Sequence, residues 1–320
     1  MRKILLPSKV VTPRQLRGLL ALLADVKTDD VVDFREFRFY VPVAVVAVLS
    51  VLKKTEARIL PQIEKQHKYL QRIDFFRIAR PNLAYEEPFI RKEEKTFTRI
   101  QTVSATTNEL NVAKNVCFDI LKNVEMKKGH PSSEKLDNIK STITYALGEI
   151  VRNVIQHSES QGFVFSQYFP ERDIIRIGIA DCGIGIRESF RRNNSEFFDP
   201  ESDDDVSMLQ KALRDRTSSK FNVPRPYGLP DNQGVGLTRV DSICELLYGS
   251  FFIASGSASY FRNGENAGYE PLPGAAFPGT VVGIEISPFQ LDNYPFPELI
   301  SEAEGLGGQL EDDRLDALFL

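Results

Sequence analysis

The sequence has few cysteines and no cysteine pattern. Its 320 residues include three, at Cys117, Cys182 and Cys244, which is an odd number with wide spacing. No cluster of cysteine and histidine accompanies them, so the sequence indicates neither a disulfide framework nor a zinc site. Cys182 lies inside a motif described below, where we expect a small packed side chain rather than a reactive thiol.

Long apolar runs are also missing. The longest one covers residues 39–52 and contains Pro42, whereas a helix that crosses a bilayer needs about 20 apolar residues. The first residues, Met1 to Pro7, lack the long apolar region and the cleavage site of a signal peptide. We therefore expect a cytoplasmic protein without a membrane span.

The chain has no large excess of either charge. It carries 40 lysines and arginines against 44 aspartates and glutamates, a formal net charge of -4, which gives no indication of a nucleic-acid-binding surface. The hydrophobic fraction of 42% and the charged fraction of 26% are typical of a soluble globular protein. A chain of this length is expected to form two domains.

The sequence does contain four polar or glycine-rich motifs between residues 146 and 286, and the first reads Ala-Leu-Gly-Glu-Ile-Val-Arg-Asn-Val-Ile-Gln-His-Ser. Its apolar residues recur at helical spacing, which predicts an amphipathic helix. Glu149 and Asn153 are four residues apart and therefore share one face of that helix. Taken alone, this pair is most simply explained as part of a solvated surface. The three motifs that follow favour a functional interpretation instead.

The second motif is a strand that ends in an acidic residue. Residues 174–180 alternate in a strand pattern and lead into Asp181, with Gly183 and Gly185 just after it. Glycines at such a position let the backbone approach a ligand closely, and the carboxylate can accept a hydrogen bond. The motif therefore indicates a ligand-binding turn.

The third and fourth motifs are glycine turns. Gly234 and Gly236 open a predicted helix, and the free backbone N–H groups at a helix start attract phosphate. The last motif, Pro-Gly-Thr, includes Thr280 and leads into a strand that ends near residue 287. A glycine pair after a strand is usually only a turn, but four such motifs in this order make a specific pattern.

Together the four motifs resemble those of the GHKL superfamily, whose ATP-binding domain is called the Bergerat fold. Its members include histidine kinases, anti-sigma-factor serine kinases, DNA gyrase B subunits, mismatch-repair clamps and a major chaperone family. The resemblance covers roughly residues 105–290. The sequence of residues 153–158 is most similar to the anti-sigma kinases and to one subgroup of histidine kinases. It implies an α+β fold, a sandwich in which helices cover a mixed, mainly antiparallel sheet.

The resemblance also implies the cofactors ATP and Mg²⁺ and a role for each motif. Asn153 would hold Mg²⁺, and Glu149 would polarise an attacking water or an acceptor hydroxyl. Asp181 would accept a hydrogen bond from the adenine amino group, with support from Thr280. The other residues that we expect at the nucleotide shape the pocket or cradle the phosphates: Gly183, Gly185, Gly234, Gly236 and Leu237.

Residues 187–233 correspond to the ATP lid of this superfamily. Loops of this length are usually functional or disordered. Thr217, Ser218, Ser219 and Lys220 offer hydroxyl groups and an ammonium group that could hold phosphates when the lid closes. An ordinary helix end with a basic cap explains the same four residues equally well.

Residues 1–80 alternate between predicted strands and helices, which argues a small α/β layer. The pattern resembles a STAS domain, the fold of anti-sigma-factor antagonists, but the corresponding segment at 39–45 has no serine or threonine to phosphorylate. We therefore expect an interaction or dimerisation module, followed by a linker at 81–104. An acidic tail, 291–320, would follow the ATP-binding domain. His67 is expected to be a surface residue, and His157 to cap the C-terminal end of its helix.

Periodicity and turn residues predict the remaining elements. The glycine-rich interval that ends at Gly274 is expected to be a loop. Helices are expected from Pro13 through Leu23, with Thr12 as the cap, and at 43–54, 66–78, 107–124 and 208–213. Strands are expected at 163–169 and 174–180, joined by a hairpin turn at 170–173, and at 250–255, 258–262 and 280–287.

The sequence leaves three functions open. The protein could bind Mg-ATP and hydrolyse it, it could transfer the phosphoryl group to a serine or threonine of a separate partner protein, or it could use ATP only to set its conformation or its dimer state. The acid at Glu149 favours an active enzyme over an inactive one, but it does not distinguish hydrolysis from transfer. Nothing in the sequence names the partner.

Overall fold

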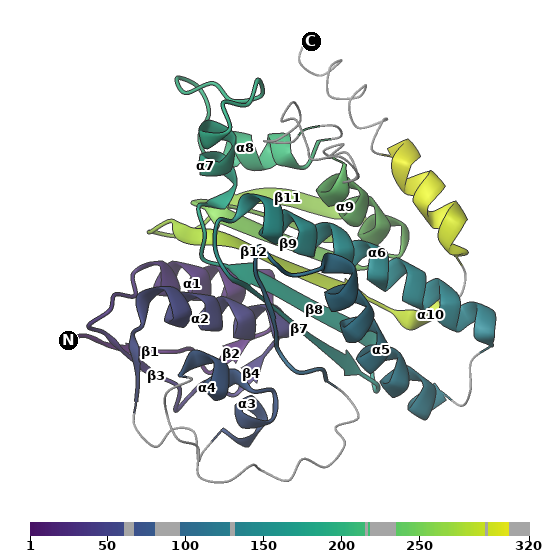
Figure 1. Cartoon of the computed structure of the whole chain (residues 1–320), viewed down its shortest axis with the longest axis horizontal. Coiled ribbons are helices and arrows are strands. Elements are labelled where there is room, and N and C mark those ends of the chain that lie inside the picture. Colours follow the sequence, from purple (N-terminus) through teal and green to yellow (C-terminus); the bar gives the residue numbers. More distant parts are fainter. Residues whose placement is uncertain are drawn as a thin grey trace.

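An antiparallel sheet of seven strands is the centre of the molecule (Figure 1). The computed structural model describes residues 1–60, 67–80, 97–128, 132–214, 217, 235–291 and 294–306. The sheet has the order β11-β10-β9-β12-β8-β7-β6, and every neighbouring pair is antiparallel. The strands are β6 (Gln101–Val103), β7 (Gly162–Phe169), β8 (Ile174–Asp181), β9 (Ser250–Gly256), β10 (Ala258–Asn263), β11 (Asn266–Pro271) and β12 (Phe277–Ile286).

Helices α5 (Glu109–Lys128), α6 (Ser133–His157) and α9 (Gly236–Leu246) pack on one face of this sheet (Figure 1). Strand side chains alternate between the faces, so Val164 of β7 joins the core under these helices while its neighbours Phe163 and Phe165 point to the other face. The expected α+β fold, with a mainly antiparallel sheet covered by helices, is confirmed at this level.

Residues 1–60 and 67–80 form a small α/β unit against the second face of the sheet (Figure 1). Its strands are parallel: β1 (Lys3–Leu5), β3 (Val31–Asp33) and β5 (Arg58–Ile59) form one sheet, and β2 (Lys9–Val10) pairs with β4 (Phe39–Tyr40). The expected helix start at Thr12 is present, because the Thr12 hydroxyl accepts a 3.3 Å hydrogen bond from the Gln15 amide. The helices are α1 (Pro13–Ala24), α2 (Pro42–Thr55), α3 (Lys68–Arg72) and α4 (Phe75–Ala79).

Helix α2 joins this unit to the sheet. Residues Pro42–Leu52 are all buried, and the helix packs on β7, β8 and β12 as well as on α1 and α4. Two glycines make room for its first turn: a Cβ atom on Gly178 would lie 2.3 Å from the Val43 nitrogen, and one on Gly283 would lie 3.3 Å from the Val43 side chain. The N-terminal unit and the sheet therefore share one hydrophobic core.

Several predicted boundaries were wrong. The helix expected at 66–78 is two short helices, because Asp74 between α3 and α4 has a left-handed backbone with φ 67°. Residues 101–103, expected in the linker, form strand β6, and Phe97 bridges to Gln167 of β7. The glycine-rich interval expected as a loop contains β11, which pairs with β10 over six residues.

Two more elements lie in the predicted lid and tail. Helix α7 (Gly185–Arg192) was not expected, whereas α8 (Asp205–Ala212) lies where the lid helix was predicted, and Asp204 caps it. After α10 (Pro288–Leu291), residues 296–306 of the predicted tail are helical, and Leu299 and Ala303 are buried in the core under α6 and α9. In the described part of the chain, no helix is long and apolar enough to cross a membrane.

Replacing Gly178 by alanine should destabilise the protein, because the added methyl group would overlap the backbone of Val43. Overpacking of this kind costs about 1–3 kcal/mol of unfolding free energy, which urea titration measures. The control is Gly18→Ala on α1, where no atom lies within 4 Å of the new Cβ. That change should stabilise the helix by about 0.5–1 kcal/mol. An equal effect of both substitutions would contradict the close seating of α2 on β8.

Candidate functional site

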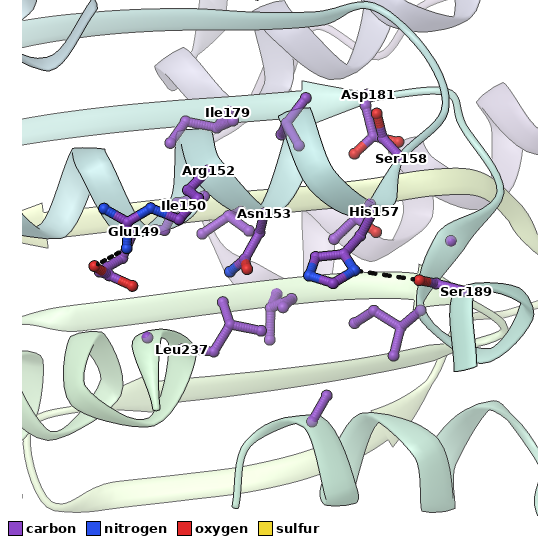
Figure 2. A pocket seen from close by; sticks show the side chains of 18 of the residues that line it. Glu149, Ile150, Arg152, Asn153, His157, Ser158, Ile179, Asp181, Ser189 and Leu237 are labelled. Carbon is purple, nitrogen blue, oxygen red and sulfur yellow. Dashed lines mark hydrogen bonds and ion pairs between the residues drawn. The ribbon is translucent and has the colours of Figure 1, made fainter. Parts of the chain in front are cut away.

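A cleft opens between α6, the end of β8, α7 and the start of α9 (Figure 2). It holds about 890 Å³ of space, part of it open to solvent, and its walls are mainly apolar. All four sequence motifs contribute to its lining: Glu149 and Asn153, Asp181 and Gly185, Gly236 and Leu237, and Thr280. The fold therefore brings together residues that are far apart in the chain, such as Glu149 and Thr280, which are 131 positions apart.

Helix α6 forms one wall of the cleft. The helix starts after Ser132, whose hydroxyl accepts from the Lys135 amide, and it runs without a break to His157. Glu149, Asn153 and His157 follow one another at four-residue spacing and point into the cleft (Figure 2). The opposite side of the helix carries buried residues such as Leu147 and Val151, so packing against the sheet fixes which face looks into the cleft.

Asp181 closes one end of the cleft. Its side chain is only 2% exposed, and its Oδ1 accepts a 2.8 Å hydrogen bond from the Gly183 amide. Burial raises the pKa of Asp181 to about 6, although hydrogen bonds from the backbone of Gly183 and Thr280 and the charge of Lys54 act in the opposite direction. A carboxylate with so little solvent can bind a ligand donor strongly.

Three glycines shape the turn around Asp181. A Cβ atom on Gly183 would lie 1.9 Å from the Ser158 carbonyl oxygen, and one on Gly279 would lie 2.7 Å from Asp181 Oδ1. Gly185 and Gly279 have positive φ angles of 74° and 111°, a region that side chains other than glycine rarely adopt. Gly185 lines the cleft, whereas Gly183 packs behind it and supports the turn.

Ser255, a residue that the sequence analysis did not single out, ties this turn to α7. Its hydroxyl donates to the Gly279 carbonyl at 2.9 Å and accepts from the Ile186 amide at 2.9 Å. The Thr280 hydroxyl donates to the hydroxyl oxygen of Ser255 at 3.4 Å. Ser255 is the residue before the end of β9, and its pairing with Thr280 of β12 places it beside the Asp181 turn.

The opposite end of the cleft carries charge. Arg152 Nη1 donates to Glu149 Oε1 at 2.7 Å, and Arg152 Nε lies 3.6 Å from Glu109 Oε1 at the start of α5. Glu149 also lies close to the first turn of α9, because a Cβ atom on Gly236 would be 2.4 Å from Glu149 Oε2. The spacing of Arg152 three residues after Glu149 is the signal that could have identified this pair.

His157 and Ser189 both line the cleft and lie toward its Asp181 end (Figure 2). The Ser189 hydroxyl lies 3.5 Å from His157 Nδ1, and Ser189 belongs to α7, which the sequence did not predict. The expected role of His157 was to close its helix, and it is indeed the last residue of α6. It also lines the cleft.

The predicted lid residues are placed only in part. Thr217 lines the cleft, whereas Ser218, Ser219, Lys220 and Gly234 lie outside the residues that the structure describes. The predicted packing role of Cys182 agrees with its environment: the thiol is buried, it donates to the Ser50 hydroxyl at 3.3 Å, and burial raises its pKa to about 12. Most of the apolar lining also belongs to the motifs, namely Ile150, Val154, Ile179, Ile186 and Val282, whereas Phe190, Ala212 and Ile253 lie outside them.

Metal ligands are sparse at the charged end. Within the described ranges, no three histidine, cysteine, aspartate or glutamate side chains come together as a metal cluster. Mg²⁺ usually takes only one or two protein ligands and completes its shell with water and substrate phosphates. The amide oxygen of Asn153, on the same helix face as Glu149, fits that kind of ligand set.

No protein-family model matches the chain, and no curated protein matches it in a sequence search.

The buried carboxylate predicts a characteristic pH dependence of stability. The pKa of Asp181 is raised from 3.8 to about 6 on folding, so the folded state keeps a proton that the unfolded state loses between these values. Stability from this group is therefore complete below about pH 4 and is lost as the pH rises through about 6. Asp181→Asn should be more stable than the parent protein at pH 7.5, by up to about 3 kcal/mol.

Urea unfolding at pH 4 and at pH 7.5 measures this difference, which should shrink at the lower pH. Asp29→Asn is the control, because it removes the same charge from an exposed position instead of a buried one. If Asp181→Asn were less stable than the parent protein at both pH values, the Asp181 carboxylate would stabilise the fold as a hydrogen-bond acceptor. It would then not be a buried group that lowers the free energy of unfolding.

Proposed function

We propose that the cleft binds Mg-ATP and that the protein is a nucleotide-dependent regulator of the GHKL type, with its ATP-binding domain in a Bergerat-type sandwich. One observation carries the proposal: residues of all four motifs line a single cleft. The antiparallel sheet, with helices on the face that holds the cleft, supports the same assignment.

The chemistry of the Asp181 end suits a purine base. Apolar side chains, among them Ile179, Ile186 and Val282, offer flat contact for a ring, and Asp181 is a buried acceptor for an exocyclic amino group. The Gly183 amide already donates to Asp181 Oδ1, so the carboxylate is held in one orientation for a ligand. A site of this type rejects a base that lacks the donor, because a buried carboxylate would then lose a partner.

The other end suits phosphates and a metal. Arg152 and Asn153 lie on α6 near Glu149, and the first turn of α9 begins at Gly236 beside them. The helical rise of about 1.5 Å per residue separates Glu149 from His157 by about 12 Å along α6, enough for a nucleoside to lie between the two ends. Bound Mg²⁺ would neutralise phosphate charge, Asn153 would hold it, and Glu149 would orient the attacking water or hydroxyl.

We infer an enzyme rather than a passive binding module, because Glu149 supplies a carboxylate at the phosphate end of the cleft. Hydrolysis and phosphoryl transfer to a protein partner need the same metal, phosphate site and base. The two reactions differ only in whether water or a hydroxyl group of the partner accepts the phosphoryl group. The N-terminal α/β unit is our candidate for the STAS-like interaction or dimerisation module.

Calorimetric titration with ATP and ADP, with and without Mg²⁺, tests nucleotide binding. The parent protein should bind ATP with Mg²⁺, and Asp181→Asn should weaken binding at least about tenfold because a charged acceptor for the base is lost. Asp29→Asn should bind like the parent protein, since Asp29 lies outside the cleft. If neither nucleotide binds the parent protein, the cleft belongs to an interaction module and the proposal fails.

Replacing Glu149 by alanine should abolish turnover without weakening Mg-ATP binding, because the nucleophile would lose its orienting carboxylate. Phosphate release and label transfer from γ-labelled ATP to candidate partners measure the two possible reactions. Glu134→Ala serves as the control, because Glu134 is exposed in the first turn of the same helix and far from the cleft. Undiminished turnover in Glu149→Ala would exclude the role assigned to Glu149.

A further inference from the structure

The charged end of the cleft has one cation for two acids. Among the described residues that line the cleft, Arg152 is the only lysine or arginine. It lies between Glu149, which accepts its Nη1 at 2.7 Å, and Glu109, whose nearer oxygen is 3.6 Å from Nε. The second distance is too long for a hydrogen bond, and Arg152 Nε is buried without any hydrogen-bond partner. Arg152 thus has donor capacity that neither acid uses.

Glu149 lies at the first turn of α9, where the proposed function places the phosphates. Its Oε2 lies against Gly236, where even a methyl group would be only 2.4 Å away, at the first turn of α9. The carboxylate is held there by Arg152 on its other oxygen. A phosphate group and this carboxylate are both anions, and both suit the guanidinium, so they compete for one partner.

A phosphate is the stronger competitor. Arginine binds phosphate oxygens in a two-point geometry, and a terminal phosphate carries more charge than a carboxylate. Glu109 belongs to α5 and does not line the cleft, so it can hold the guanidinium from behind while the inner partner changes. The Glu149 carboxylate that leaves Arg152 then stays beside the phosphate, where a base is needed.

We propose that Arg152 exchanges Glu149 for the terminal phosphate of the bound nucleotide, that this exchange releases Glu149 for its role in turnover, and that Glu109 is the positioning residue that holds Arg152 during the exchange. This inference rests on the proposed nucleotide-binding function. It makes Arg152 the residue that distinguishes a nucleoside triphosphate from a diphosphate, and it makes the ligand itself the trigger that frees the acid.

The test is a double-mutant cycle on Mg-ATP and Mg-ADP binding, measured by calorimetry on the full chain. Arg152→Gln should weaken ATP binding by about tenfold or more and ADP binding much less, because only ATP brings the terminal phosphate. Glu149→Gln should tighten ATP binding by about tenfold, because an uncharged amide no longer competes for Arg152. In Arg152→Gln, the further change Glu149→Gln should bring no gain.

The last comparison separates the exchange from simple charge repulsion. If Glu149→Gln tightened ATP binding equally with and without Arg152, the carboxylate would only repel the nucleotide, and the exchange would be refuted. Equal losses for ATP and ADP in Arg152→Gln would refute the assignment of Arg152 to the terminal phosphate. Circular dichroism and thermal unfolding of each variant check that it folds, and Arg152→Lys, which keeps the charge, should retain part of the preference for ATP.

Glu109→Gln tests the positioning role. It should weaken ATP binding in the parent protein, because Arg152 then returns to Glu149, and it should have little effect in Glu149→Gln. A loss of the same size in both backgrounds would show that Glu109 only stabilises α5. If the parent protein binds ATP but none of these differences appears, the exchange fails alone; if it binds no nucleotide, the exchange fails together with the proposed function.

Discussion

The close seating of helix α2 on β8 and β12 is the constraint on which both halves of the molecule depend. The helix is buried along Pro42–Leu52, and its first turn packs against Gly178 of β8 and Gly283 of β12, which have no side chains to obstruct it. Its later turns reach the back of the cleft, where Ser50 accepts a hydrogen bond from Cys182 and the charge of Lys54 acts on Asp181. The N-terminal unit therefore packs directly behind the strand that carries the buried carboxylate, in addition to sharing its core.

The cleft concentrates features that do not favour the folded state by themselves. Asp181 is buried with a raised pKa, so its charged form at neutral pH lowers stability, and no lysine or arginine is hydrogen-bonded to it among the described residues. Gly185 and Gly279 hold positive φ angles, which glycine adopts without strain and other residues rarely adopt. An unfavourably buried charge is typical of ligand sites, because a ligand that supplies the missing donor recovers the free energy that burial costs.

Local sequence signals predicted those parts of the fold that local interactions decide. The amphipathic pattern of α6, the hairpin of β7 and β8, and the Thr12 cap are properties of neighbouring residues, and the structure has all three. Strand β11 and the break at Asp74 were missed, because pairing with β10 outweighs a glycine-rich composition and one left-handed residue divides a helical pattern. Ser255 enters the site only through the register of β9 and β12, which no local pattern contains.

The two ends of the cleft connect to the N-terminal unit by different routes. Helix α2 reaches the Asp181 end directly. Toward the other end, the Ile100 amide donates to the Ile73 carbonyl of the N-terminal unit, and the chain then continues through β6 to Glu109, next to Arg152. Coupling between distant sites needs an element with two discrete arrangements. In the proposed exchange, Arg152 would be such an element, so a shift of α5 and a change of ligand would act on the same guanidinium.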